Sequence, residues 1–227
     1  MSKRVSLSLL DPYIGPRLAS LYPRLSIPKW FPPEGIVAIG HLSAIAGAIG
    51  LGLSTTYWWG GVLGAIGITG NHIADCVDGR HARATGQCRN GGELLDHFTD
   101  PLSFTYWMIG LAVACGRLDL GLVAVTVLMA MAVLTNLRAK LTGEFSLAAF
   151  GPTEFKTLLV AFGVALSIIA YNWPANLLDV CFGGLATLTC VGVVLLPIQL
   201  FQSVREVNRS AVAADTSEWE TTRRGQA

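Results

Sequence analysis

The sequence predicts an all-α, polytopic membrane protein with six transmembrane helices and an N-terminal amphipathic segment at the membrane interface. Three observations lead to this fold class. Of the 227 residues, 52% are hydrophobic and only 14% are charged, whereas an ordinary soluble domain has roughly 25% charged residues. Apolar runs of near-spanning length recur along the chain, and roughly 20 such residues carry a helix across a bilayer. Basic residues gather on one side of the resulting topology, as the positive-inside rule requires.

The same composition excludes other classes of protein. The high hydrophobicity excludes an intrinsically disordered chain. The net charge of +1 offers no bulk electrostatic basis for binding nucleic acid. The five cysteines show no C-x-x-C spacing and lie mostly in apolar runs, which favours small buried thiols over a metal site or a disulfide framework.

The first element, residues 1–32, is expected to lie on the cytoplasmic face of the membrane. Within 5–28, Leu, Ile and Tyr alternate with Arg and Ser, a pattern typical of an interfacial amphipathic segment. The alternative is a plain flexible tail, because Pro12, Pro16 and Pro23 interrupt the pattern.

Residues 33–205 are expected to form the six-helix transmembrane domain. The predicted spans are residues 35–54, 57–77, 94–115, 118–137, 156–172 and 178–203. The breaks between them are too short to hold a soluble domain. A soluble all-α protein with buried helices is the alternative, and six runs of this length argue against it. The polar residues 206–227 are expected to be a solvated cytoplasmic tail.

The orientation follows from the lysines and arginines. Six spans place both termini on one side, together with the loops between spans two and three and between spans four and five. That side would hold 15 of the 16 basic residues, and Arg117 would lie opposite. The prediction is therefore a multi-pass integral membrane protein with cytoplasmic termini, in the plasma (inner) membrane if the source is bacterial.

Carboxylates cluster where the second span ends and the third begins. Asp75 and Asp78 lie three residues apart, and Asp96 and Asp100 lie four apart, so each pair shares one face of its helix. Glu93 lies about one turn before Asp96. Ionised carboxylates at a membrane boundary are costly and repel one another, so a cation must compensate them.

Two kinds of cation could compensate this cluster. One is a set of structural ion pairs with Arg80, Arg83 and Arg89. The other is a hard divalent ion with oxygen ligands, Mg²⁺ or Mn²⁺, which can also bind substrate phosphates. The spacing favours the metal.

These residues resemble a known family. The chain reads Asp75-x-x-Asp78-Gly79-x-x-Ala82-Arg83, then eight residues, then Gly92-x-x-x-Asp96-x-x-x-Asp100. The pattern is similar to the signature of the CDP-alcohol phosphotransferases (CDP-alcohol phosphatidyltransferases) at every fixed position. The resemblance covers roughly residues 30–205. It implies an enzyme that transfers a phosphoalcohol from a CDP-linked donor to an alcohol, releases CMP and works as a homodimer among membrane lipids.

The resemblance also implies roles for the motif residues. The metal ligands of two divalent ions, Mg²⁺ or Mn²⁺, would be Asp75, Asp78 and Asp96, with Asp100 completing the set. The CDP site would be lined by Gly79, Ala82 and Arg83, with Gly92 leaving room between spans two and three. Each has a plainer alternative: Gly79 as a helix C-cap, Arg83 as a solvated charge, and Gly92 as a helix-start residue.

The segment Gly92-Glu93-Leu94-Leu95-Asp96-His97 resembles the ethanolamine/choline phosphotransferase branch. That branch implies a small CDP-alcohol donor and a diradylglycerol-like lipid acceptor. The alternative within the family is a CDP-diacylglycerol donor with a small polar alcohol, such as glycerol phosphate, inositol phosphate or serine. The chain departs from the family at Pro33-Glu34, where members often carry Pro-Asn.

Two further features each allow two interpretations. The run from Gly151 to Glu154 before the fifth span either matches an acidic segment of the same branch or forms a capped turn. A phosphorylated acceptor could be bound by Arg138, Lys140 and Lys156, although the positive-inside rule favours simple cytoplasmic anchoring for them.

The catalytic base has two candidates. The family assigns it to Asp100, but a carboxylate bound to divalent ions is a poor proton acceptor. The other candidate is His97, because an unperturbed histidine side chain titrates near neutral pH. Glu93, four residues before it, could orient the ring as the carboxylate does in a catalytic triad. Outside the enzyme class, the rivals are a membrane transporter with a carboxylate cation site and a catalytically silent scaffold. The acidic cluster lies at a membrane edge rather than in broken helices at the midplane, which disfavours a transporter.

Overall fold

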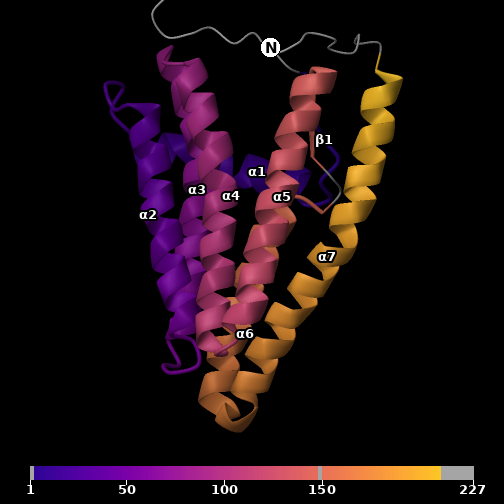
Figure 1. Cartoon of the computed structure of the whole chain (residues 1–227). Coiled ribbons are helices and arrows are strands. Elements are labelled where there is room, and N and C mark those ends of the chain that lie inside the picture. Colours follow the sequence, from indigo (N-terminus) through magenta and orange to yellow (C-terminus); the bar gives the residue numbers. More distant parts are fainter. Residues whose placement is uncertain (1–2, 148–149, 211–227) are drawn as a thin grey trace, which may run out of the picture.

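The structure, a computed structural model, describes residues 3–147 and 150–210. Six long helices cover the six predicted runs (Figure 1): α2 Pro33–Gly52, α3 Gly60–Thr85, α4 Asn90–Ala114, α5 Leu118–Thr142, α6 Pro152–Asn172 and α7 Leu177–Arg209. The short elements are β1 Lys3–Ser6, α1 Asp11–Ala19, η1 Tyr22–Leu25, β2 Glu144–Leu147 and η2 Pro174–Asn176. The predicted all-α class is confirmed, and most of the expected C-terminal tail lies outside the described residues.

Four stretches of the described chain are long and apolar enough to cross a membrane: α2, α5, α6 and the stretch Pro174–Arg209. They support an integral membrane protein. The other two long helices, α3 and α4, carry the aspartates and the arginine of the motif together with several histidines, and these polar residues lower their apolarity. Six crossings and a cytoplasmic orientation therefore stay predictions.

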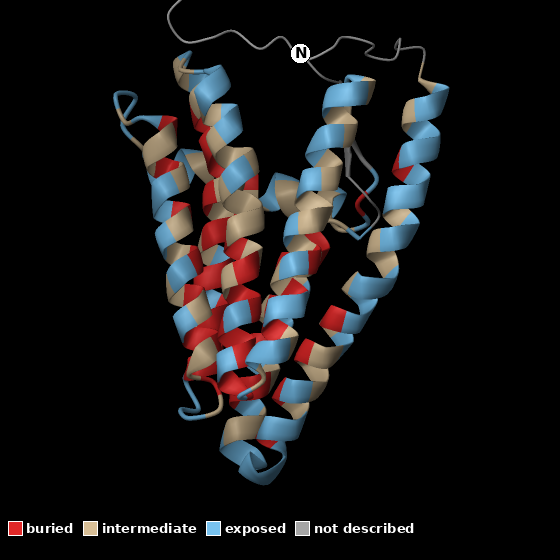
Figure 2. Ribbon diagram, viewed as in Figure 1, coloured by how far each residue is buried: buried red, intermediate tan, exposed pale blue. Residues whose placement is uncertain are grey.

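The helices pack around α2 and α3. The α2 helix packs against both α3 and α4, while α3 also contacts α6, and α5 joins α4 to α7. Figure 2 shows buried residues concentrated where α2, α3 and α4 meet, whereas α5 and α7 are largely exposed. At the centre of this core, Trp107 is fully buried and its Nε1 donates to the Ala44 carbonyl at 3.0 Å.

Glycine lets α3 approach its neighbours closely. A Cβ atom on Gly61 would collide with the Gly163 carbonyl of α6, and one on Gly67 would collide with the backbone of Gly47 in α2. Small residues at such crossings allow membrane helices to pack backbone against backbone. The position of α3 is therefore fixed from both sides, and with it the aspartates near its end.

The N-terminal segment is folded onto this bundle, so the interpretation as a plain flexible tail is wrong for its described part. The β1 strand pairs in parallel with β2, from Lys3 opposite Glu144 to Ser6 opposite Leu147, a pairing that the sequence did not predict. The α1 helix contacts α3 and α6. Contact of this segment with the membrane surface stays a prediction.

Two buried side chains hold the N-terminal segment. Glu154 of α6 accepts hydrogen bonds from Ser8 Oγ at 2.6 Å and from the Leu10 backbone N–H at 2.8 Å. His81 of α3 donates from Nε2 to the Phe31 carbonyl at 2.8 Å and lies 3.1 Å from the Tyr22 hydroxyl. Both side chains are buried, so these contacts belong to the core.

Candidate active site

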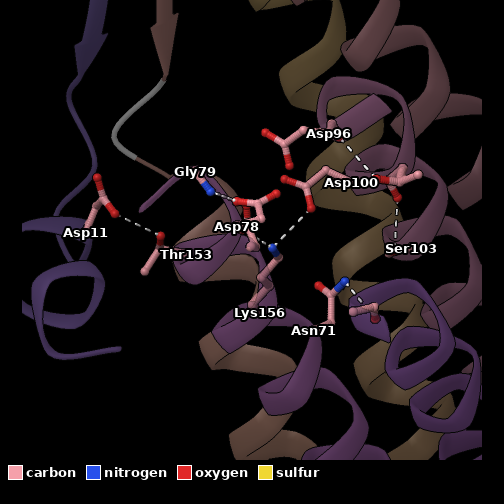
Figure 3. Close-up of polar contacts among 12 residues, drawn as sticks. Asp11, Asn71, Asp78, Gly79, Asp96, Asp100, Ser103, Thr153 and Lys156 are labelled. Carbon is pink, nitrogen blue, oxygen red and sulfur yellow. Dashed lines mark hydrogen bonds and ion pairs between the residues drawn. The ribbon is translucent and has the colours of Figure 1, made fainter. Parts of the chain in front are cut away.

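The aspartates of the motif converge between α3 and α4. Asp75, Asp96 and Asp100 each offer a carboxylate oxygen, and these oxygens all lie within 4.8 Å of one another. Asp78, one turn after Asp75, is buried beside them and accepts a hydrogen bond from the Gly79 backbone N–H. Figure 3 shows Asp78, Asp96 and Asp100 lying around a common point.

The local sequence explains this convergence. A spacing of three or four residues places both carboxylates of each pair on one helix face. In the described chain, α3 and α4 each pack more closely on α2 than on one another. The space between them is therefore free for side chains from both helices.

A lysine lies inside the cluster. Lys156 of α6 is 0% exposed, and its Nζ lies 2.6 Å from Asp75 Oδ2 and 3.2 Å from Asp100 Oδ1. Figure 3 shows this side chain pointing toward the aspartates. The expectation that Lys156 is a cytoplasmic anchor is wrong, because the residue is buried and paired.

The arginines of the loop do not compensate the cluster. Among the described residues, Arg80, Arg83 and Arg89 form no ion pair with the four aspartates, and Arg89 instead lies 3.7 Å from Glu34 Oε1. The interpretation as a knot of arginine salt bridges is therefore wrong. The cation that the cluster does contain is the Lys156 ammonium, which demonstrates a geometry able to hold a positive charge. Three converging carboxylates also fit a hard divalent ion such as Mg²⁺ or Mn²⁺.

The residues expected to line the CDP site lie along the last turns of α3. Gly79 is inside the helix rather than at its C-cap, which is Gly86 with φ 71°. A Cβ atom on Gly79 would lie 3.2 Å from Nη1 of Arg83, so the glycine leaves room for the guanidinium. Ala82 is half-buried and Arg83 is exposed. An open depression of about 520 Å³ is lined by Tyr22, Arg80, Arg83 and Ala84.

Gly92 faces α2 rather than α3. A Cβ atom there would lie 3.9 Å from Glu34 Oε1. Glu34 is the residue that stands where family members often carry Asn, and its Oε2 is buried without a hydrogen-bond partner among the described residues. The departure at Glu34 thus lies beside the motif.

The Glu93 and His97 pair is present at the start of α4. The His97 Nε2 atom lies 4.0 Å from Glu93 Oε1, and the two side chains are 21% and 49% exposed. The His97 ring also packs edge-on against Phe145 of β2, with 4.6 Å between the ring centroids. The histidine is therefore held in place by its own helix and by the strand after α5.

The family follows from a comparison with protein-family models. The model described as CDP-alcohol phosphatidyltransferase matches residues 38–204, which include all six long helices in whole or in part. The chain belongs to the CDP-alcohol phosphatidyltransferase family. Members of this family are transferases of substituted phosphate groups, so the predicted enzyme class is confirmed.

Curated relatives agree with the predicted branch of the phosphatidyltransferases. The chain is 33% identical over 113 residues to cholinephosphotransferase 1 of Gallus gallus. This alignment covers 47% of this chain and 33% of that protein. It is 30% identical over 94 residues to the Homo sapiens protein of the same name, and this alignment covers 39% of this chain and 23% of that protein. The aligned region thus spans a third or less of the length of these relatives. The similarity supports the choline/ethanolamine branch that the residues after Gly92 predict.

The sequence did not predict the contacts of two residues near the start of α6, Lys156 in the aspartate cluster and Glu154 against the N-terminal segment. The position of Lys156 in the sequence gives one indication of its role, because a charged residue at the start of an apolar run is a functional candidate by default. Glu154 was assigned either to a capped turn or to an acidic segment. Its Oε2 accepts from the Gly151 backbone N–H at 2.8 Å, so the turn is capped, and its Oε1 holds the N-terminal segment. No local pattern predicts that second contact.

Proposed function

We propose that this chain transfers a phosphoalcohol from a small CDP-alcohol to a diradylglycerol-like lipid alcohol and releases CMP, in a reaction that depends on a divalent ion. The observation that carries the proposal is the convergence of Asp75, Asp96 and Asp100 within a chain that matches the phosphatidyltransferase model. The similarity to cholinephosphotransferases supports the small CDP-alcohol as donor.

The metal ligands in this proposal are Asp75, Asp96 and Asp100, with Asp78 buried beside them. We propose two ions, Mg²⁺ or Mn²⁺. When bound, such ions neutralise the charge that develops on phosphate oxygens during displacement at phosphorus. The carboxylates contribute hard oxygen ligands, which both ions prefer.

The donor site is proposed along the end of α3. Arg83 can pair with a phosphate through two parallel hydrogen bonds, and Gly79 keeps the space beside it open. Arg80 lines the same depression and adds positive charge. We also assign Ala82 and Gly92 to this site from the family motif, and Gly92 of α4 lies next to Glu34 of α2.

The residues proposed to remove the proton of the acceptor hydroxyl lie at the start of α4. A base removes the proton of the acceptor hydroxyl, whose oxygen forms a bond to the β-phosphorus while the bond to CMP breaks. The base is His97, oriented by Glu93, or Asp100. His97 is supported by its placement 4.0 Å from Glu93, and Asp100 by its place in the motif.

The alternative donor, CDP-diacylglycerol with a small phosphorylated acceptor, would use basic residues to bind the acceptor phosphate. Two of the three candidates are already paired. Lys156 contacts Asp75 and Asp100, and Arg138 lies 3.7 Å from Glu206. These contacts favour the small CDP-alcohol.

The proposed setting is an integral membrane homodimer with both termini and the active site in the cytoplasm. The polar ends of α3 and α4 lie at the same end of the bundle as the end of α7 (Figure 1). A cytoplasmic site would give a CDP-linked donor direct access from solution, while the lipid acceptor would enter from the bilayer.

A donor panel tests the proposal. Purified protein is incubated with Mn²⁺ and radiolabelled CDP-choline or CDP-ethanolamine plus diacylglycerol, or with CDP-diacylglycerol plus glycerol phosphate, inositol phosphate or serine. We expect labelled phospholipid and CMP only with the small CDP-alcohols, and none in EDTA. Product from CDP-diacylglycerol alone would refute the branch but leave the family intact. Full activity in EDTA after dialysis would refute the metal dependence.

A further inference from the structure

Lys156 is the cation of the aspartate cluster in this structure, and its position is tightly constrained. Its side chain is completely buried, and the described residues offer its ammonium two acceptors, Asp75 and Asp100. The Nζ atom also lies 5.7 Å from the centroid of the Phe104 ring, a cation–π contact. A buried ammonium is stable only while it stays paired, so these two carboxylates hold the lysine in this position.

The same two carboxylates are accessible from their other side. The Asp75 and Asp100 side chains are 26% and 25% exposed, whereas the Lys156 side chain is 1% exposed. The lysine therefore lies on the buried side of the cluster, and a divalent ion would approach from the solvent-exposed side. Both cations would draw on the carboxylates of Asp75 and Asp100.

We propose that Lys156 is a built-in counter-ion that opposes the divalent metal: it holds the aspartate cluster together when the metal is absent and lowers the affinity of the cluster for the metal. This inference rests on the proposed function, because it presumes a divalent ion at these carboxylates. It adds a positioning residue from α6 to a site otherwise built on α3 and α4.

The direction of the effect follows from charge. The four aspartates and Lys156 together carry a formal charge of −3, and without the lysine they carry −4. If the ammonium stays in place, it repels the incoming ion at short range in a partly buried site. If the ion displaces it, the ammonium loses its two ion pairs in a buried position. Both routes weaken metal binding, and this penalty exceeds the benefit of orienting two carboxylates by hydrogen bonds.

Metal binding in the absence of substrate tests the proposal. Full-length protein in detergent is titrated with Mn²⁺, and free Mn²⁺ is followed by electron paramagnetic resonance. For Lys156→Gln, which keeps a hydrogen-bonding group but removes the charge, we expect binding tighter by on the order of tenfold or more. For Lys156→Arg, which keeps the charge, we expect affinity within about threefold of the unmodified protein. The matched control is Lys29→Gln, which removes an exposed charge outside the cluster and should leave the affinity unchanged.

Thermal unfolding gives a second, independent readout. In EDTA, Lys156→Gln should melt at a lower temperature than the unmodified protein, because its carboxylates repel without a counter-ion. Adding Mn²⁺ should remove this difference in melting temperature. If Lys156→Gln folds only when Mn²⁺ is present, this outcome also supports the proposal, because the loss of stability then depends on the absence of metal.

The outcomes separate the two proposals. Equal or weaker Mn²⁺ binding by Lys156→Gln, equal tightening in Lys156→Arg, or a failure of Lys156→Gln to fold even with Mn²⁺ would overturn the role of Lys156 while leaving the proposed function standing. An unmodified protein that binds no Mn²⁺ would overturn the metal dependence itself.

Discussion

At the scale of single residues, Asp96 offers a direct test of the metal ligands. Among the described residues it forms no ion pair with Lys156, so Asp96→Asn should change the ligand set without leaving a buried lysine unpaired. We expect phosphoalcohol transfer to be abolished and Mn²⁺ binding to weaken, because an amide oxygen is a poorer ligand for a hard ion than a carboxylate. CMP release and Mn²⁺ titration measure the two effects. The matched control is Asp179→Asn, an exposed aspartate at the start of α7, which should retain activity; a fully active Asp96→Asn protein would contradict the assignment.

The base is the second prediction at this scale. If His97 removes the hydroxyl proton, His97→Ala should lower turnover by a factor on the order of 10²–10⁴ while donor affinity is largely kept. Asp100→Asn should instead impair metal binding as well, because Asp100 belongs to the cluster. Turnover and donor affinity are measured separately over a range of pH. His41→Ala serves as control, since the His41 ring packs on Tyr106. If His97→Ala keeps near-normal turnover and the pH dependence of its turnover is unchanged, the base is Asp100 rather than His97.

The cluster itself could be predicted from the chain, but its lysine could not. The four aspartates fall at helical spacings within one short segment, so their spacing alone predicts that they lie close together. Lys156 is 81 residues from Asp75 and 56 from Asp100 in the sequence. A lysine just before an apolar run also looks like an anchor under the positive-inside rule. Only the packing of α6 on α3 distinguishes the two roles.

At the scale of helices, the close contact of α3 with α6 can be tested with one glycine substitution at the crossing and a control substitution in α7. Gly61→Ala would place a methyl group against the Gly163 carbonyl, and we expect a loss of about 1–3 kcal/mol from overpacking. Gly183→Ala in α7 meets nothing within 4 Å, so it should be neutral or stabilising by up to about 1 kcal/mol, because alanine favours the helix over glycine. Thermal unfolding in detergent compares them. Equal stability of both variants would contradict a close α3–α6 contact.

The attachment of the N-terminal segment to α6 is a further prediction for the elements. Glu154 accepts hydrogen bonds from Ser8, Leu10 and Gly151. Glu154→Ala should destabilise the protein by about 1–3 kcal/mol, because three donors lose a charged acceptor. The melting temperature and the protease sensitivity of the N-terminal segment measure the effect. Glu206→Gln is the control, because Glu206 is half-exposed and an exposed ion pair contributes little. A protein as stable and protected as the unmodified one would refute the attachment.

The long helices were predictable because apolar runs and short polar breaks determine them locally. The observed ends extend past several predicted spans: α3 continues to Thr85 and α5 to Thr142. Those last turns carry charged residues, which a hydropathy window excludes, although they are helical. The β1 and β2 strands escaped prediction for a different reason. Each has four residues, and their pairing joins parts of the chain that have no local signal in common.

At the scale of the whole molecule, the number of membrane crossings can be measured by labelling. With six crossings, the exposed Cys88 between α3 and α4 lies on the side of the termini, and Arg117 lies on the other. In intact cells, a membrane-impermeant thiol reagent should label an Arg117→Cys protein at the substituted position, and it should label Cys88 only after permeabilisation. A Cys88→Ser variant provides the background. Labelling of Cys88 in intact cells, to the same extent as the substituted position, would mean that α3 and α4 do not cross.

The pairing of β1 with β2 also imposes an order on biosynthesis. The first strand leaves the ribosome about 140 residues before its partner, which at about 5–20 residues per second is an interval of roughly 7–30 s. During that time α2 to α5 emerge, and α1 can already contact α3, but the β1 strand has no strand to pair with. The first strand of the chain is therefore among the last elements to reach its final position, because β1 can pair only after β2 has been made.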